Sequence, residues 1–177
     1  MAVTAGGCIL LVALEACGQS RFAERESGDL PCTATFFDPP FDHVDPCSAE
    51  QVAVAAVETV FTYRPSEQAD QGSSVKAAAP LLDVGLAARS VTSGTVLTPI
   101  TGSQWQRWRS LGIAVVASVR LGEDDHLIDT HTTFARVAGV TLHPGDETET
   151  ILLAAFVRAS RPDSSAGWRI SALEVRT

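Results

Sequence analysis

Four runs of strand-forming residues occupy the last third of this 177-residue chain and limit its fold more than any other feature. Each run is rich in Val, Ile, Leu and Ala, and turn-forming residues such as Gly, Pro, Asp and Ser separate it from the next. The links are too short for the crossover that a parallel pair of strands requires. The sequence therefore predicts a four-stranded antiparallel meander with strands at 112–121, 129–142, 150–158 and 168–176.

The predicted strands differ in how their two faces are composed. Alternate positions of the first strand are apolar and point to one face, whereas Ser118 and Arg120 point to the other. The third strand is apolar at both sets of positions over its first half. We expect such a strand to be covered on both faces or to line a pocket. The apolar positions of the first strand are Ile113, Val115, Ala117, Val119 and Leu121.

A long amphipathic helix is expected before the meander. Ser48 followed by Gln51 forms a capping box, which is typical of a helix N-terminus. The helix should end before Arg64, because Pro65 pushes the preceding residue out of the helical conformation. Between these limits an apolar stripe recurs at helical spacing and must be buried. The stripe consists of Val52, Ala53, Ala56, Val57, Val60 and Phe61.

Shorter helices are expected in the middle of the chain. Residues 73–79 predict one helix, and Pro80 suits the first turn of another that runs to about Arg89. Residues 90–101 contain Gly and Pro and predict an irregular loop.

A last short helix is expected to lead into the first strand. Ser103 predicts its N-cap, and Trp105 and Trp108 fall on one face because they are three positions apart. Helices followed by a long antiparallel meander indicate an α+β arrangement. We therefore expect, over residues 48–177, N-terminal helices packed on a curved four-stranded antiparallel sheet.

Residues 1–17 are typical of a secretion signal. The apolar run from Cys8 to Leu14 is too short to span a bilayer, which takes about 20 residues, but suits a signal peptide. The residues around Cys17 resemble a lipobox, which predicts export and a lipid anchor at Cys17 on the outer face of the cell membrane. The run lacks a preceding Lys or Arg, and Glu15 stands where a small or uncharged residue is usual. Export by another route and a buried N-terminal strand or helix are the alternatives.

Residues 18–47 predict a tether followed by a proline-rich arm. The first part is composed mainly of Gly, Gln, Ser, Arg and Glu, which is typical of a flexible spacer. The apolar segment from Phe36 to Phe41 is broken by Pro39 and Pro40, so it cannot be a central strand. It is expected to pack on the domain as an extended arm, or alternatively to bind a partner.

Cys32 and Cys47 bracket this arm and are expected to form a disulfide. In an oxidising compartment, closing a loop of about 15 residues would stabilise the fold by roughly 3 kcal/mol. Two unpaired buried thiols are the alternative. Zinc is disfavoured, because neither a second Cys pair nor a His pair lies nearby at ligand spacing.

The charge of the chain argues against a nucleic-acid partner. The formal net charge is −8, so the excess of Lys and Arg that nucleic-acid binders carry is missing. Lys76 is the single lysine, and Arg supplies nearly all the positive charge. Together with abundant Ala, Val and Gly, this usage indicates a GC-rich bacterial genome.

Few residues suggest chemistry. Asp129 and His131 share a face of the predicted second strand and are candidates for an acid–base pair. The acidic segment 123–126 is rich in ligand atoms, but it lacks the calcium-loop pattern and suits a solvated turn. We expect no catalytic site, metal ion or cofactor. The candidate pocket or interface residues are Trp105, Trp108, Asp129, His131, Arg136 and Arg158.

Four segments carry a resemblance to a known fold family. They are Val-Glu-Thr-Val-Phe-Thr-Tyr-Arg-Pro at 57–65, Ala-Pro-Leu-Leu at 79–82, Trp-Gln-Arg-Trp at 105–108 and Gly-Trp-Arg-Ile at 167–170. With them, residues 48–177 resemble the nuclear transport factor 2-like, or cystatin-like, cone. They are most similar to actinobacterial envelope proteins of that fold, the Mce-associated proteins and the periplasmic domains of conjugation systems (TcpC-like). Those proteins commonly sit on a transmembrane helix, whereas this chain offers a lipobox-like sequence.

Three functional hypotheses follow from the residues and the resemblance. The first is a non-catalytic interaction domain of the cell envelope, an accessory component of a conjugation or transport assembly. Its partners would be other envelope proteins, the membrane through a lipid anchor, and further copies of itself in a homo-oligomer. The second is a binding module for a lipid or small apolar ligand in the cone, and the third is an enzyme of the same fold. Fold alone does not choose among them.

Overall fold

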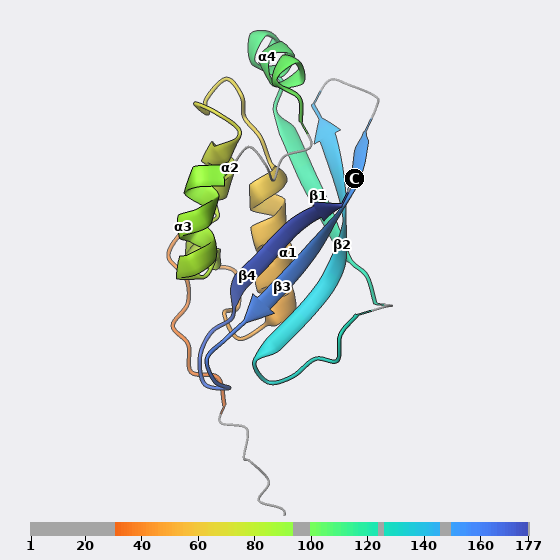
Figure 1. Ribbon diagram of the computed structural model, residues 1–177. Helices are drawn as coiled ribbons and strands as arrows, with labels where there is room; N and C mark the ends of the chain where they lie inside the picture. The colour runs from red at the N-terminus through yellow and green to blue at the C-terminus, as the bar shows by residue number, and fades with distance from the viewer. Residues whose placement is uncertain (1–30, 94–99, 124–125, 146–149, 177) are drawn as a thin grey trace, which may run out of the picture.

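The computed structural model describes residues 31–93, 100–123, 126–145 and 150–176. They form an α+β fold in which helices precede a four-stranded antiparallel sheet of strand order β1-β2-β3-β4 (Figure 1). The predicted fold class and strand order are thereby confirmed. The helices are α1 (Ala49–Phe61), α2 (Gly72–Ala77), the 3-10 turn η1 (Ala79–Leu81), α3 (Val84–Ser93) and α4 (Gly102–Leu111). The strands are β1 (Val115–Leu121), β2 (Thr133–Pro144), β3 (Ile151–Ser160) and β4 (Arg169–Arg176).

Helix α1 begins and ends where the sequence predicts. The Ser48 hydroxyl accepts a hydrogen bond from the Gln51 amide at 3.2 Å, and the Gln51 side chain accepts from the Asp45 amide at 3.1 Å. The whole predicted apolar stripe is buried. Helix α1 contacts all four strands, and in Figure 1 α2 and α3 lie on the side of α1 away from β1 and β2.

The segment after α2 does not form the single helix expected from Pro80. The chain makes the short turn η1 and then extends at Leu82, which pairs in parallel with Ile170 of β4. The Asp83 amide donates to the Ile170 carbonyl at 2.8 Å, and the Asp83 carboxylate accepts from the Leu86 amide as α3 begins. Pairing with the sheet edge therefore interrupts the helix, and a new cap restarts it. Helix α3 also includes Ser90 to Ser93, which were expected in a loop; residues 94–99 lie outside the described residues.

Helix α4 starts earlier than its predicted cap. Thr101, and not Ser103, is the N-cap, and its hydroxyl accepts from the Gln104 amide at 3.2 Å. The helix ends at Gly112, whose φ of 68° is the left-handed conformation that glycine adopts without strain. The first strand consequently begins at Val115 and not at residue 112.

The strand boundaries shift most in β2. This strand begins at Thr133, four residues later than predicted, so Asp129 and His131 belong to the connection between β1 and β2. Their predicted placement on a strand face is wrong. The register places Ala117 opposite Leu142, Ala138 opposite Ala155, and Val157 opposite Leu173. A bulge after Arg158 then brings Ala159 opposite Ile170.

One face of the sheet is covered by helices and the other is open. We call the covered side the inner face; its buried residues are Val115, Ala117, Ala138, Val140, Leu142, Ala155, Val157, Ala159, Ile170 and Leu173. On the opposite side, the outer face, Leu152 is 76% exposed and Val116 is 58% exposed. The third strand is therefore not covered on both faces along its first half, since Leu152 is exposed. Further along the strand, Phe156 lines a surface hollow on the outer face, which agrees with the alternative expectation of a pocket.

The proline-rich segment packs on the end of the domain where α1 begins. Phe37, Phe41 and Val44 are buried in the core. The Thr33 amide donates to the Ser165 carbonyl at 2.9 Å, and the Trp168 amide donates to the Pro46 carbonyl at 2.8 Å. These bonds fasten the segment to the connection between β3 and β4.

Candidate functional site

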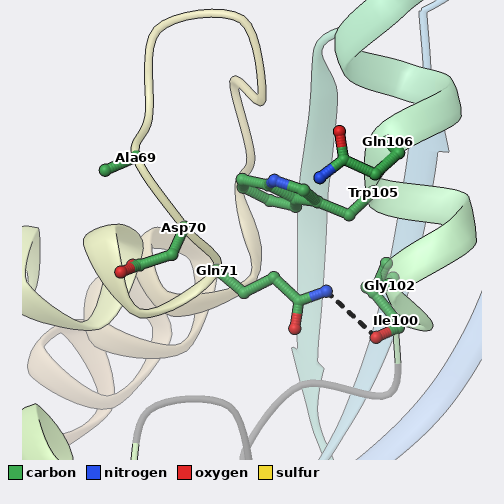
Figure 2. Close-up of a pocket in the computed structure, with 7 residues that line it drawn as sticks. All are labelled: Ala69, Asp70, Gln71, Ile100, Gly102, Trp105 and Gln106. Carbon is green, nitrogen blue, oxygen red and sulfur yellow. Dashed lines mark hydrogen bonds between the residues drawn. The ribbon is translucent and has the colours of Figure 1, made fainter.

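A surface recess lies between the connection that joins α1 to α2 and the first turns of α4 (Figure 2). It has a volume of about 440 Å³. Figure 2 shows the Trp105 indole projecting from α4 into the space between Gln106 and Gln71, while the Asp70 carboxylate points away from the ring. The Gln71 amide donates to the Ile100 carbonyl at 3.1 Å and so links the two walls. The recess is lined by Ala69, Asp70, Gln71, Ile100, Gly102, Trp105 and Gln106.

Trp105 is part of the packing of this end of the molecule. It is 4% exposed, and its ring meets Tyr63 edge-on with centroids 5.8 Å apart. The Arg109 guanidinium lies 5.9 Å from the indole centroid and donates to the carbonyls of Pro65 at 2.8 Å and Ala69 at 2.9 Å. Arg109 thus holds the connection after α1 against α4. Trp105 closes the wall of the recess and does not offer an open stacking face.

Two fully buried aromatic side chains carry polar atoms that have no hydrogen-bond partner among the described residues. They are the Tyr63 hydroxyl and the Trp108 indole nitrogen. Burial raises the pKa of Tyr63 far above its ordinary value, because the phenolate would be desolvated. Tyr63 therefore remains a neutral phenol and does not serve as a proton acceptor at physiological pH. Trp108, a predicted pocket or interface residue, lies wholly in the core.

Asp129 and Arg136, both predicted as site residues, come together at the opposite end of the molecule. Both guanidinium NH groups of Arg136 donate to the Asp129 carboxylate, one at 2.8 Å and one at 2.5 Å. The Arg136 side chain is 13% exposed and the Asp129 side chain 43% exposed. The guanidinium also lies 4.3 Å from the Phe134 ring centroid and donates to the Ala135 carbonyl at 2.8 Å. Arg136 is therefore held on three sides.

This pair fixes the charge state of Asp129. The hydrogen bond from Arg136 lowers the pKa of the Asp129 carboxyl, and the same bond raises the pKa of Arg136. Both oxygens of the Asp129 carboxylate accept from Arg136, so the carboxylate is engaged in the pair. Its geometry is that of an ion pair that anchors the connection between β1 and β2 to the start of β2.

His131 faces the connection between β3 and β4. Its backbone carbonyl accepts from Nε of Arg161, and the Arg161 amide donates to the Thr132 carbonyl at 3.1 Å. The Arg161 guanidinium stacks over Trp168, 4.4 Å from the ring centroid. Arg161 thus ties together the two connections at this end of the sheet. Sequence reasoning did not single out Arg161, because nothing in its local pattern signals contacts to carbonyls 30 residues away.

Arg158, the remaining predicted pocket or interface residue, is exposed on the outer face of β3, opposite Ala135. The connection between β1 and β2 lies over part of the outer face. There Leu127 borders a hollow of about 350 Å³ together with Val137 and Phe156. The exposed apolar residues of the outer face are the feature that sequence reasoning missed. Their signal was present as the apolar alternate positions of the third strand, which were attributed to a covered face.

The space between α1 and the inner face is filled by side chains. Val52, Ala56 and Val60 of α1 are completely buried, as are Val115 and Val157 of the strands. The hollows described above open at the surface, and so does a smaller one of about 240 Å³ where Glu50, Glu123 and Arg136 meet. Within the described residues no three His, Cys, Asp or Glu side chains are grouped so that they could hold a metal ion.

The predicted disulfide between Cys32 and Cys47 is confirmed, with Cα atoms 5.8 Å apart. The predicted lipidation site, Cys17, lies outside the described residues, as does the whole segment 1–17. In the part of the chain that the structure covers, no helix has the length and apolar character needed to cross a bilayer.

Comparison with known proteins assigns this chain to no family. No protein-family model and no solved structure matches the chain. A stretch of 112 residues is 36% identical to a protein of Pisum sativum described as "Probable aquaporin PIP-type 7a". This stretch is 63% of the chain but only 36% of the aquaporin. The chain therefore spans about a third of the relative, which does not define a family for it.

Proposed function

We propose that this protein is a non-catalytic interaction domain of the bacterial cell envelope, anchored by a lipid on Cys17 and serving as an accessory component of a conjugation or transport assembly. We further propose that its α+β fold is a cone of the nuclear transport factor 2-like type. The order of elements supports this fold, because α1 packs along the inner face of a four-stranded meander.

The observation that carries the proposal is the distribution of apolar side chains. Those between α1 and the inner face fill the interior, whereas Leu152 and Val116 are exposed on the outer face. A domain built this way offers a surface for contact and not an enclosed apolar cavity for a ligand. Both oxygens of Asp129, the candidate acid–base carboxylate, are occupied by hydrogen bonds from Arg136. Both features favour work by contact over turnover.

The anchor is tested by fractionation of cells that express the full chain with a C-terminal tag. The expected result is that the wild type sediments with membranes and that Cys17→Ser moves to the soluble fraction. Cys8→Ser is the matched control, because it changes a thiol in the apolar run that precedes Cys17 without touching the lipid acceptor, and it should stay with membranes. Membrane retention of Cys17→Ser would remove the lipid anchor from the proposal.

The non-catalytic role is tested by complementation of a deletion strain. Asp129→Asn and His131→Gln should restore the activity of the assembly, measured as transfer or transport frequency, to the wild-type level. Cys17→Ser should not restore it, because a released domain loses the high local concentration that an anchor provides. Loss of activity in the Asp129 or His131 variants, with folding unchanged, would favour an enzyme or ligand site instead.

A further inference from the structure

The outer face has the composition of a protein contact surface. Its centre, on β2 and β3, is apolar or small: Val137 lies opposite Phe156, and Gly139 lies opposite Ala154. Leu152 extends this strip along β3. Most side chains around the strip are polar, although Val116 of β1 and Ala172 of β4 also lie on this face. The polar surrounding residues are Ser118, Arg120, Thr141, His143, Arg158 and Glu174. An apolar centre within a polar rim is the usual anatomy of an interface.

The charge of the outer face differs from that of the whole molecule. The chain has a formal net charge of −8, so two copies repel each other through most of their surfaces. The described side chains of the outer face carry two positive charges, on Arg120 and Arg158, and one negative charge, on Glu174. A second copy can therefore approach this face with less repulsion than elsewhere.

The sheet edges are less suited to a second copy than the face. On β1, Val115 exchanges two hydrogen bonds of 2.8 Å with Tyr63. On β4, the Ile170 carbonyl accepts from the Asp83 amide at 2.8 Å. Each edge strand is thus already paired at one position, which interrupts the row of free groups that strand addition requires.

The size of the outer face fits a weak homodimer. Four strands at a spacing of about 4.8 Å, with a mean length of about nine residues at about 3.3 Å each, give at most about 600 Å² per copy. Two copies would bury at most about 1,200 Å², at the lower end of the range for specific interfaces. An association in the micromolar range is expected for such an area when its centre is apolar.

We propose that the outer face of the sheet binds the outer face of a second copy of this chain. In this isologous, two-fold pair the central strips of β2 and β3 face each other, so that each copy covers the other's Leu152 and Phe156. The pair does not depend on the envelope role proposed above.

Sedimentation velocity of the full chain over about 1 to 500 µM tests this pair. Cys8 and Cys17 are changed to Ser in this protein, so that neither lipid nor intermolecular disulfides contribute. The expected result is a reversible monomer–dimer equilibrium, and Leu152→Glu should raise its dissociation constant by about tenfold or more. Val84→Glu is the matched control, because Val84 is 89% exposed at the start of α3, off the outer face, and it should leave the constant unchanged.

Each result is decisive once unfolding curves show that both variants remain folded. A monomer over the whole range would overturn the proposal. So would a dimer that Leu152→Glu does not weaken, since the contact would then lie on another surface. Equal weakening by Val84→Glu would point to general charge repulsion. None of these results bears on the fractionation of Cys17→Ser, so the two proposals fail separately.

Discussion

Arg136 determines the role of Asp129. Its side chain projects from β2, stacks on Phe134 and donates hydrogen bonds to the carboxylate of Asp129, seven residues earlier in the chain. The sequence places both residues in one predicted strand but does not show that the chain turns back between them. The result is an ion pair with two hydrogen bonds, in which the cation is nearly buried and the anion is half exposed. Such a pair orders a connection and occupies both oxygens of the carboxylate.

The Asp129–Arg136 pair predicts a specific pH dependence of stability. Because Arg136 lowers the pKa of Asp129 in the folded state, the carboxylate stabilises the fold fully above its unfolded pKa of about 3.9, and this contribution is lost as the pH falls through the lowered value. The free energy of unfolding of the wild type should therefore exceed that of Asp129→Asn above about pH 5, and the difference should shrink below about pH 4. Urea denaturation between pH 2.5 and pH 7 measures it.

The matched control repeats this comparison in an Arg136→Gln background. In that background, the difference in free energy of unfolding caused by Asp129→Asn should no longer shrink below about pH 4, because the partner of the carboxylate is gone. Comparing variants also cancels the contribution of Asp163, whose pKa is lowered by the Ser165 hydroxyl in both proteins. A pH dependence that persists without Arg136 would show that another group is responsible.

At the scale of elements, helix ends depend on which hydroxyl reaches a free amide. Thr101 and Ser103 both precede apolar residues of α4, and either is an acceptable cap by residue type. The extended backbone at Thr101, with ψ near 154°, lets its hydroxyl reach the Gln104 amide. Ser103 is already inside the helix, and its hydroxyl lies 3.0 Å from that of Thr101.

Alanine substitution at these two positions distinguishes the caps. Thr101→Ala should lower the free energy of unfolding by about 1 kcal/mol, because an amide of the first turn loses its partner. Ser103→Ala should change it by less than about 0.5 kcal/mol, as for other exposed positions. Equilibrium denaturation of both variants checks the prediction. A larger effect at Ser103 than at Thr101 would place the helix start where the sequence alone had suggested.

At the scale of the whole molecule, the disulfide links the two ends of the proline-rich arm, and backbone hydrogen bonds hold both ends on the connection between β3 and β4. Cys32 lies beside Thr33, which bonds to Ser165, and Cys47 follows Pro46, which bonds to Trp168. The arm is therefore closed at both ends against the connection between β3 and β4. Phe37 and Phe41 of the arm are buried in the hydrophobic core, so the arm is part of that core.

Removing this disulfide should destabilise the domain. For a sequence separation of 15 residues the expected loss in Cys32→Ser/Cys47→Ser is about 3 kcal/mol, because the unfolded chain gains freedom. Denaturation of the double variant against the wild type measures this loss. In the wild type purified from the envelope, intact mass after alkylation should show no label on Cys32 or Cys47 until reductant is added. Labelling of both thiols without reductant would contradict the prediction.

The sequence by itself determined the elements whose signals are local. The Ser48 cap, the apolar stripe of α1 and the short polar links between strands are each contained within one helix or one hairpin. Such signals predict an α+β fold with an antiparallel meander, and the fold agrees. The spacing of Cys32 and Cys47 likewise predicted their pairing.

Tertiary structure decided what depends on residues far apart in the chain. The predicted helix is interrupted at Leu82 because the backbone there pairs with Ile170 at the edge of β4. No local sequence pattern predicts this contact. The start of β2 moved to Thr133, and Asp129 was left to pair with Arg136. The alternation in β3 identified two apolar faces but not which one the helices would cover, because a strand's sequence is the same whether a layer packs on it or not. Leu152 is exposed for that reason.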